Sequence, residues 1–417
     1  MLEPASAARR RVFVTGVGLI SPHGGEPEEV FERLYAGESA IRKVHSGTTE
    51  FGADALLARA ECDPAGVIPK TQLLLMDRVS QMAVVAAHRA LRAAKLLVED
   101  RGPSTAGVYI GCGLGGSNAI QEAYRSYYER HIRKVKPSTV PLIMTNAPAS
   151  HISMRYRILG PSLTYSIACS SSAVAIGEAF RAIRDGYLDC ALAGGTESML
   201  NDGALVAWDG LGVLAKEHAD GAAASSRPFS KDRTGFVLGE GSAAIVLETQ
   251  EAMRARGAQP IAEVVGYGAS SDAHNLTQPA VDGQVRAMRA ALADAGLQPE
   301  RVGYINAHAT ATPAGDKIEI DAIKQTFGDH ARRLAVSATK SMHGHLVGAA
   351  GALEFAITVL ALNKRRLPPT ANLTMPDPEC DLDCVPCVGR QAPNLEYALS
   401  NSFAFGGSNA VLVARRA

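Results

Sequence analysis

The chain contains two segments, far apart in the sequence, that repeat the same order of strand and helix patterns. Residues 164–201 read as a strand (TYSIA), a helix rich in small residues (CSSSAVAIGEAFRAIRDG) and a second strand (CALAGG). Residues 334–363 read as a strand (LAVSA), a glycine-rich turn and another helix rich in small residues (GHLVGAAGALEFAITVLAL). Apolar strands that alternate with helices of period 3.6 are typical of α/β proteins. The repeat therefore predicts an α/β fold built from two similar halves.

Each half also closes on a similar strand, EGSAAIVLE at 240–248 and GGSNAVLVA at 406–414. We place the boundary near Gly257, so that residues 1–257 form an N-terminal half and residues 258–417 form a C-terminal half. Helices this rich in Ala and Gly let neighbouring backbones approach closely, so we expect them to be buried between sheets. Neither half is expected to be an independent domain.

Composition excludes several classes of partner. The 417 residues contain 42 Lys and Arg against 42 Asp and Glu, so no overall field attracts nucleic acid or an anionic membrane. The strand-like VFVTGVGLI near the N-terminus is nine residues long, too short for a signal peptide or a membrane span. We therefore expect a cytoplasmic protein with neither nucleic-acid nor membrane partners. Seven cysteines, an odd number, favour free thiols over a disulfide framework in such a chain.

Three of these cysteines, Cys380, Cys384 and Cys387, have a C-x3-C-x2-C spacing that is compatible with an iron–sulfur cluster. They lie in a loop rich in Pro and Asp, TMPDPECDLDCVPCV, and no fourth ligand or glycine-rich partner follows. The ligand count favours a coincidence, so no metal is expected.

Cys169 is the strongest candidate for a nucleophile. It follows the strand that ends in Ser166-Ile167-Ala168 and precedes a helix that begins with three serines. A thiol at a helix N-terminus meets the positive end of the helix dipole and free backbone N–H groups, which lower the thiol pKa. The same turn offers backbone donors to an oxyanion. A small buried thiol is the usual fate of a cysteine, but the position before Ser-Ser-Ser favours catalysis.

A covalent cysteine enzyme needs basic partners, and the best candidates follow strands. His308 comes after the strand GYINA, and Lys340, His343 and His345 lie in the strand-to-helix turn of the second half. His345 thus occupies the turn that Cys169 occupies in the first half, and pseudosymmetry is expected to bring the two turns face to face. The H-G-H sequence suggests a metal pair, but no carboxylate or Cys accompanies it, so a solvent-facing or packing role is favoured for His343.

Two glycine-rich stretches resemble nucleotide-binding loops without the rest of the pattern. Gly111–Gly116 matches G-x-G-x-x-G after a strand, but the polar helix with a basic end that follows lacks the expected acidic residue. We interpret it as a tight turn that lines an apolar cavity. NSFAFGGSN at 401–409 lacks the Lys-Ser/Thr ending of a phosphate loop, and we interpret it as a mobile loop that brings Phe403 and Phe405 near a pocket.

Taken together, these residues resemble the elongating β-ketoacyl-acyl-carrier-protein synthases of the thiolase superfamily, particularly synthase II. The resemblance runs over nearly the whole chain, through six motifs in the right order: RRVFVTGVGLISP, GPSLTYSIACSSSAVAIGEA, SRPFSKDRTGFVLGEGSAAIVLE, INAHATATPAGDKIE, KSMHGHLVGAAGALE and SNSFAFGGSNAVLV. It implies a thiolase-like duplicated five-layer αβαβα fold and a homodimer, or a heterodimer with a chain-length-factor-like subunit.

The resemblance also assigns roles. Cys169 resembles the acylated nucleophile, and His308 and His345 resemble the pair that promotes loss of CO2 from a malonyl unit and stabilises the enolate. Lys340 and Glu319 resemble a charged pair that orders the site. Phe405 resembles a gating aromatic whose backbone N–H forms part of the oxyanion hole. Residues that resemble contacts to the phosphopantetheine arm and substrate are Thr310, Thr312 and Thr277, with Asp316 nearby. Leu114 resembles an acyl-pocket residue, and Arg133 and Lys134 resemble contacts to the carrier. No permanent cofactor is implied, since the arm arrives on the acyl carrier protein.

The sequence departs from the family at three of these places. Ala309 and Ala404 replace glycines, and His343 replaces a residue that is usually Thr. Ala restricts φ, so gating-loop motion and entry of the arm are expected to differ. The Cys-His-His set remains intact, but a specialised polyketide or polyene pathway stays open beside housekeeping fatty-acid synthesis.

Related reaction types need other residues. Biosynthetic thiolases use a second Cys, and synthase III enzymes use Cys-His-Asn, where this chain has His345. An inactive chain-length subunit lacks the nucleophile, and a non-catalytic carrier-binding scaffold has no need of three catalytic positions. The sequence therefore favours a decarboxylating synthase, with a subunit of a heterodimeric ketosynthase/chain-length-factor system as the alternative.

Overall fold

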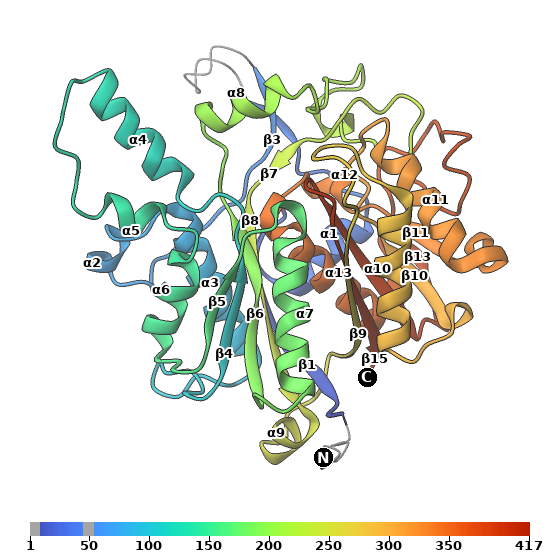
Figure 1. The fold of residues 1–417 in the computed structure, drawn as a ribbon, viewed down its shortest axis with the longest axis horizontal. Coiled ribbons are helices and arrows are strands. Elements are labelled where there is room, and N and C mark those ends of the chain that lie inside the picture. The colour runs from blue at the N-terminus through green and yellow to red at the C-terminus, as the bar shows by residue number, and fades with distance from the viewer. Residues whose placement is uncertain (1–8, 45–53) are drawn as a thin grey trace.

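The computed structural model describes residues 9–44 and 54–417; the leading residues MLEPASAA lie outside this part. A mixed ten-stranded sheet forms its centre, in the order β11-β10-β14-β15-β9-β1-β8-β6-β4-β5 (Figure 1). The strands of the first half are β1 (Val12–Ile20), β4 (Gly107–Gly111), β5 (Ser162–Tyr165), β6 (Cys190–Glu197) and β8 (Gly241–Thr249). Those of the second half are β9 (Ala262–Ser271), β10 (Val302–Asn306), β11 (Ala335–Ser337), β14 (Tyr397–Ala404) and β15 (Ser408–Arg416).

The two halves of this sheet have the same topology. Reading inward from each edge, β5-β4-β6-β8-β1 corresponds strand by strand to β11-β10-β14-β15-β9. β4 pairs in parallel with β5 and β6, as β10 does with β11 and β14, and the remaining pairs are antiparallel. Among the described strands, the pairing that joins the two half-sheets is the short antiparallel one of Val12–Val14 with Ala262–Val264. The predicted duplication of an α/β unit is confirmed.

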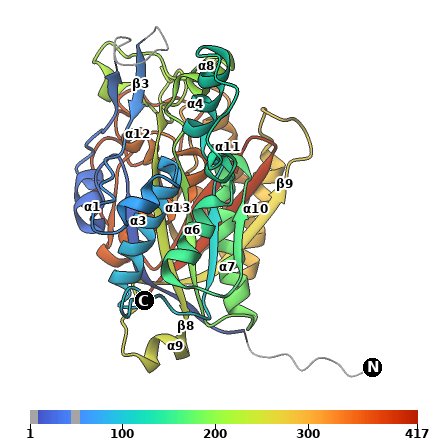
Figure 2. The same cartoon turned by 90° about the vertical axis from the view of Figure 1, so that its left-hand side faces the viewer.

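Helices complete the layers on both sides of each half-sheet. The helices of these layers are α3 (Arg78–Ala93), α6 (Ala147–Tyr156), α7 (Ser171–Arg184), α10 (Val281–Asp294), α11 (Gly315–Phe327) and α13 (Ala350–Lys364). α3 packs on β1 and β8, and α10 packs on β9 and β15. α7 and α13 contact each other and strands of both halves, so they form the central layer (Figures 1 and 2). The arrangement is the expected five-layer αβαβα fold.

Small residues allow the two central helices to pack closely, as the sequence predicts. A Cβ atom added at Gly351 of α13 would lie 2.9 Å from the backbone nitrogen of Ala173 in α7. The stretch Val347–Lys364 is long and apolar enough to cross a membrane by length and composition, but 89% of it is buried inside the protein. It is the core helix of this fold.

The other α-helices and strands surround these layers. They are α1 (Pro27–Tyr35), α2 (Lys70–Leu73), α4 (Ser117–Tyr128), α5 (Thr139–Ile143), α8 (Asp202–Gly210), α9 (Gln250–Ala255), α12 (Lys340–His343), β2 (Arg42–Val44), β3 (Ala55–Ala58), β7 (Leu238–Gly239), β12 (Arg366–Leu367) and β13 (Arg390–Gln391). Gly257 lies between α9 and β9, and a domain boundary there stays a prediction. The helix with a basic end is shorter than expected, because α4 ends at Tyr128 and the basic residues 130–136 follow outside it.

Candidate active site

Two equivalent turns carry the candidate nucleophile and one of its partners. A 3-10 turn at Ala168–Ser170 precedes α7, and another at Val347–Ala349 precedes α13. Each begins with a left-handed residue, at φ 43° for Ala168 and 44° for Val347. By position, the counterpart of Cys169 is therefore Gly348 rather than His345, which lies three residues earlier. The predicted meeting of the two turns holds, but the one-to-one match of Cys169 with His345 does not.

The three serines after Cys169 explain why the chain turns sharply there. The Ser171 hydroxyl accepts a hydrogen bond from the Ile167 N–H at 2.8 Å and donates to the Ala168 carbonyl at 2.7 Å. The Ser172 hydroxyl accepts from the Ala352 N–H of α13 at 2.9 Å. These bonds close the turn on itself and tie it to the second half, so that Cys169 faces the second turn.

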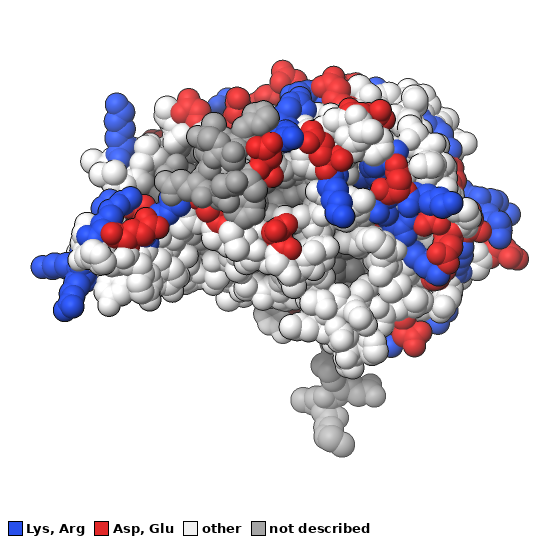
Figure 3. Space-filling model, turned by 90° about the horizontal axis from the view of Figure 1, so that it is seen from above, with Lys and Arg blue, Asp and Glu red and all other residues white. Residues whose placement is uncertain are grey.

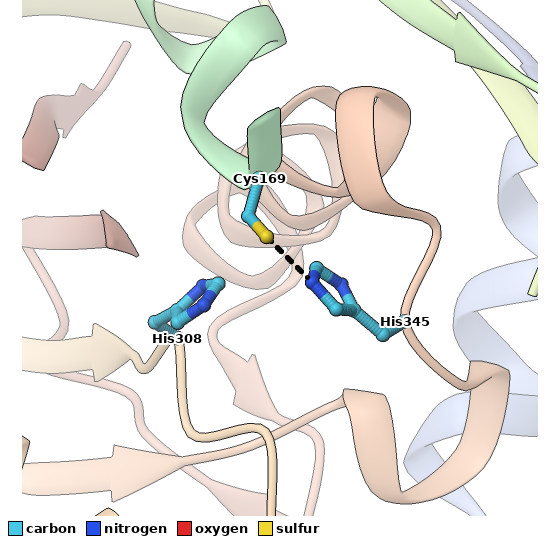
Figure 4. A group of neighbouring side chains, drawn as sticks. All are labelled: Cys169, His308 and His345. Atoms are coloured by element: carbon cyan, nitrogen blue, oxygen red, sulfur yellow. Dashed lines mark hydrogen bonds between the residues drawn. The ribbon is translucent and has the colours of Figure 1, made fainter. Parts of the chain in front are cut away.

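The structure brings Cys169, His308 and His345 together (Figure 4). The Cys169 Sγ lies 3.0 Å from the His345 Nε2, and the two imidazole rings stand nearly perpendicular with centroids 5.5 Å apart. The His345 backbone is fixed by β7 and the residue before it, since its N–H donates to the Val237 carbonyl at 2.7 Å and its carbonyl accepts from the Gly239 N–H at 2.9 Å. All three side chains are buried. The arrangement places one thiol within proton-transfer distance of one imidazole and near a second.

The Cys169 pKa differs from the sequence-based expectation. Burial raises the pKa of the thiol to about 11, and this outweighs the lowering by the Lys340 charge and by the backbone N–H groups of Phe405 and Cys169 itself. The expected low thiol pKa is therefore wrong for the unliganded site, because the thiol is buried. Burial and the Lys340 charge also lower the pKa of His345 well below its usual value. The resting pair is thus a neutral thiol and a neutral imidazole that is free to accept its proton.

Lys340 orients His308. Its ammonium Nζ lies 3.4 Å from the His308 Nδ1, and an ammonium can only donate, so the imidazole proton resides on Nε2. The counter-ion of Lys340 is Glu354, which contacts the same Nζ and is fully buried. The expectation that Glu319 is the ion-pair partner of Lys340 is therefore wrong. Sequence reasoning missed Glu354; what sets it apart is that it is the single charged residue in the otherwise apolar stretch GALEFAITVLAL.

Glu319 and Asp316 instead hold the loop that follows β10. Glu319 accepts hydrogen bonds from the backbone N–H groups of His308 (2.9 Å) and Ala309 (2.7 Å), and from the Asn401 amide at 2.9 Å. Asp316 accepts from the Ala311 N–H at 3.0 Å and is fully buried outside the cavity. Burial raises its pKa to about 7. The expected substrate contact of Asp316 is therefore wrong, and both carboxylates position the backbone around His308.

A cavity of about 290 Å³ opens onto Cys169 and both histidines. Thr277, Thr310, Thr312 and Phe405 line it, as the sequence led us to expect, and Phe403 does so too. The Gly406 N–H donates to the Leu276 carbonyl at 2.7 Å, which ties the Phe405 loop to the segment that carries Thr277.

Two aromatic residues of the cavity wall were missed. Trp208, the only tryptophan of the chain, stacks on the Phe405 ring with centroids 6.2 Å apart and meets Phe236 edge to face. Phe236 in turn packs edge to face on the His345 ring. Trp208 lies on α8, a short helix that carries no catalytic motif, so no sequence signal beyond its uniqueness marked it.

Leu114 and the glycine-rich loop do not reach this cavity. Leu114 has 53% of its surface exposed, and neither it nor the rest of Gly111–Gly116 lines the cavity. The loop instead wraps around Glu197, whose carboxylate accepts the N–H groups of Gly113 and Leu114. The expected cavity-lining role of the loop is wrong in this structure, because its amides are turned to an internal carboxylate, and the expected acyl-pocket role of Leu114 stays a prediction.

The family departures are accommodated without backbone strain. His343 is fully buried, and its two ring nitrogens lie within hydrogen-bond distance of the Gly344 carbonyl (2.7 Å) and the Thr339 hydroxyl (3.0 Å). It therefore has the packing role that we favoured over a metal pair. Neither Ala309 nor Ala404 has a positive φ, so alanine fits the conformation observed at both places.

All seven cysteines are free thiols. Cys384 and Cys387 direct their sulfurs at the backbone carbonyls of Cys380 and Leu373. Within residues 9–44 and 54–417, the group close enough to hold a metal ion is Cys169, His308 and His345, whose ligand atoms lie within 4.8 Å of one another. The Lys340 ammonium beside His308 opposes a further cation there.

Comparison with known proteins agrees with this site. Residues 9–252 match the family model "Beta-ketoacyl synthase, N-terminal domain", and residues 261–374 match "Beta-ketoacyl synthase, C-terminal domain". Nodulation protein E of Rhizobium sp. (strain N33) is 42% identical over 407 residues, which cover 98% of this chain and 99% of that protein. The 3-oxoacyl-[acyl-carrier-protein] synthase 2 of Staphylococcus aureus (strain N315) is 39% identical over 410 residues, 98% of each chain.

A solved structure gives the same result for the fold. The ishigamide ketosynthase/chain length factor superimposes with a TM-score of 0.90 at 34% identity, covering 98% of this chain and 100% of that chain. Together with the two matched domain models, these similarities show that the chain belongs to the beta-ketoacyl synthase family.

Proposed function

We propose that the protein catalyses decarboxylative condensation of an acyl group, held on Cys169, with malonyl-acyl carrier protein to give β-ketoacyl-acyl carrier protein. The observation that carries this proposal is the Cys169–His345 contact at 3.0 Å with His308 beside it. A 3-oxoacyl-[acyl-carrier-protein] synthase 2 relative at 39% identity supports the carrier as the source of both substrates.

In the first half-reaction, the His345 Nε2 accepts the thiol proton as the Cys169 sulfur attacks the acyl thioester. The backbone N–H groups of Cys169 and Phe405, which are directed at the sulfur, stabilise the oxyanion that develops on the acyl carbonyl. The carbon–sulfur bond to the first carrier breaks, and its phosphopantetheine thiolate takes the proton from His345 and leaves, so that His345 is neutral again. The acyl group remains on Cys169 as a thioester.

In the second half-reaction, malonyl-carrier binds with its thioester carbonyl facing His308 and His345. The His308 Nε2–H, fixed by the Lys340 contact at Nδ1, donates to that oxygen as the bond to the carboxylate breaks. The bonding electrons form an enolate and CO2 leaves. The enolate carbon then attacks the acyl thioester, and Cys169 departs as a thiolate that takes up a proton from solvent. Two neutral imidazoles suit this step, because burial and Lys340 lower the pKa of both.

Different walls of the cavity suit different parts of the substrate. We infer that Thr277, Thr310 and Thr312 contact the phosphopantetheine arm, since they offer hydroxyls along the cavity wall. Trp208 and Phe405 supply an aromatic wall for the acyl part. No permanent cofactor is needed, because the arm brings the reactive thioester.

The proposal also concerns assembly and location. The similarity to a ketosynthase/chain length factor supports a dimeric enzyme, either with an identical subunit or with a chain-length-factor-like partner. We place it in the cytoplasm, where such carriers are used.

A condensation assay tests the proposed function. Acyl-carriers of different chain lengths are each mixed with malonyl-carrier and the protein, and products are followed by mass spectrometry. Release of CO2 together with a β-ketoacyl-carrier supports the proposal, and the preferred length distinguishes a fatty-acid from a polyketide or polyene substrate. Absence of product with every carrier in the panel contradicts it.

We infer that the carrier docks on the basic segment after α4. Lys and Arg side chains project from this end of the molecule (Figure 3), and Arg133 and Lys134 are exposed. Acyl carrier proteins are acidic, and this chain has no net charge, so attraction requires a local patch. Reversal of charge at both residues (Arg133→Glu and Lys134→Glu) is expected to raise the KM for acyl-carrier about tenfold and to reduce its salt dependence.

A small pantetheine thioester serves as the control substrate, because it brings no acidic surface and is expected to react unchanged. Reversal of charge at Arg92 and Lys95, two exposed residues at the end of α3, serves as the control variant. Equal loss with both substrates would mean that the segment supports the fold, and no loss with either would place the carrier elsewhere.

A further inference from the structure

Glu197 is a buried carboxylate at the end of β6 whose hydrogen-bond partners are all backbone N–H groups. It is fully buried. Its Oε2 accepts from the N–H groups of Gly113 at 2.8 Å and Gly348 at 3.1 Å, and its Oε1 accepts from Leu114 at 3.3 Å. Within the described part of the chain, no cationic side chain pairs with it. A buried carboxylate without a counter-ion is costly to the fold, so its retention calls for a reason.

These contacts join both of the turns that carry the reactive groups. Gly348 lies three residues after His345, in the turn before α13. A Cβ at Gly348 would lie 2.5 Å from the Glu197 Oε2, so glycine is what allows this approach. On the other side, the Gly113 carbonyl accepts a hydrogen bond at 3.0 Å from the hydroxyl of Ser166, three residues before Cys169. The chain of bonds therefore runs from Ser166, just before the first turn, through Gly113 and Glu197 to Gly348 in the second turn.

We propose that Glu197 is a positioning residue, which in its ionised form holds the two turns together and so sets the contact between the Cys169 thiol and the His345 imidazole. The inference deepens the proposed function, since it concerns the same thiol–imidazole pair. Glu197 touches no reacting atom. It acts through the backbone of Gly113 and Gly348, and its loss is expected to weaken proton transfer from Cys169 to His345.

The protonation of Glu197 makes this role dependent on pH. Burial raises the pKa of Glu197 to about 7, and the three N–H donors keep it from rising further. The titratable group that faces it from the glycine-rich loop is Cys112, whose own pKa burial and Glu197 raise well above its usual value. Below about pH 7 the Glu197 carboxyl is protonated, so one of its oxygens carries a hydrogen. That oxygen accepts less well from the backbone N–H groups around it, and at least one of these hydrogen bonds weakens.

Ionisation of Glu197 strengthens these hydrogen bonds but lowers the stability of the fold. Because the pKa of Glu197 in the folded state lies above its usual value of 4.5, the folded protein keeps this proton between about pH 4.5 and 7 while the unfolded chain loses it. This group therefore lowers the free energy of unfolding as pH rises through that window. If the thiol becomes more reactive as the pH rises from about 4.5 to 7, a more stable fold is therefore not the cause.

The test is the rate at which iodoacetamide alkylates Cys169, followed by intact mass and peptide mapping between about pH 5.5 and 8. Glu197→Gln keeps the shape of the side chain but replaces one acceptor oxygen with a donor. At about pH 8 we expect the variant to react about tenfold more slowly than the wild type. At about pH 5.5 the two rates should converge, so that the ratio of rates changes with a midpoint near pH 7. Glu248→Gln, which alters a buried carboxylate paired with Arg256, is the matched control and should leave the ratio flat.

Ser166→Ala provides a second variant in case Glu197→Gln does not fold. Ser166 is exposed, so its hydroxyl can be removed safely, and the loss of its bond to Gly113 should slow alkylation about threefold. A pH-independent ratio for Glu197→Gln, or unchanged rates for both variants, would overturn the inference. Alkylation needs no carrier substrate, so this outcome would leave the proposed condensation untouched, and failure of the condensation assay would leave the alkylation result standing.

Discussion

The Cys169→Ala variant is expected to take up no acyl group from any acyl-carrier, while the wild type gains the mass of one acyl group per chain. The reason is that no other cysteine among the described residues lines the cavity, and the backbone donors that stabilise the oxyanion are arranged around the Cys169 sulfur. Condensation should fall by at least about 10⁴-fold, as expected when a covalent route is lost. Intact-protein mass spectrometry after incubation with acyl-carrier measures the loading.

Cys112→Ala is the matched control for this experiment. Cys112 is also fully buried, but it lies in the glycine-rich loop outside the cavity, so loading should persist. Acylation of Cys169→Ala at the stoichiometry of the wild type would show that another residue is the nucleophile.

The Lys340→Met variant is expected to lose about 3 kcal/mol of unfolding free energy at about pH 8, because it leaves the Glu354 carboxylate buried without its cation. The loss should be smaller at about pH 6, since burial already raises the pKa of Glu354 to about 7 and the carboxyl can neutralise itself by binding a proton. The His308 Nδ1 also loses its donor, which frees the imidazole to adopt the other tautomer. Decarboxylation should therefore fall about a hundredfold, roughly 2.7 kcal/mol of barrier.

Urea unfolding at the two pH values measures the stability, and two variants serve as controls. Lys324→Met breaks a partly exposed pair with Asp381 and should cost less than about 1 kcal/mol. Lys340→Met combined with Glu354→Gln removes both charges, so its loss should be smaller than the sum of the single losses. Equal losses at both pH values, or additive losses in the double variant, would show that the two side chains do not act as a pair.

The duplicated fold could be predicted because its signals are local. The strand and helix patterns on either side of Cys169 recur before α13, and each half closes on a strand with a similar sequence. The meeting of Cys169 with His345 followed from that symmetry alone. The residue-by-residue alignment of the two turns could not be predicted. It is set by the left-handed residues Ala168 and Val347, and composition gives no sign of their backbone conformations.

The partners of buried charges could not be predicted, because they depend on which helix the fold places opposite. Lys340 pairs with Glu354 of α13 rather than with Glu319, although both carboxylates lie in the same half. The raised pKa of Cys169 has the same origin: a helix start is visible in the sequence, but the depth of burial that outweighs it is not. The sequence of the glycine-rich loop likewise did not predict that its backbone N–H groups donate to Glu197.

We infer that His308 and His345 promote loss of CO2 from malonyl-carrier in the cavity that Cys169 faces. CO2 release by Cys169→Gln tests it most directly, because this variant cannot be acylated and any turnover reports decarboxylation alone. We predict that Cys169→Gln retains or exceeds the wild-type rate of CO2 release, that adding His308→Ala or His345→Ala lowers it at least about a hundredfold, and that adding His343→Thr does not. A folded Cys169→Gln protein that releases no CO2, or one in which His343→Thr is as damaging as the other two changes, would contradict the account.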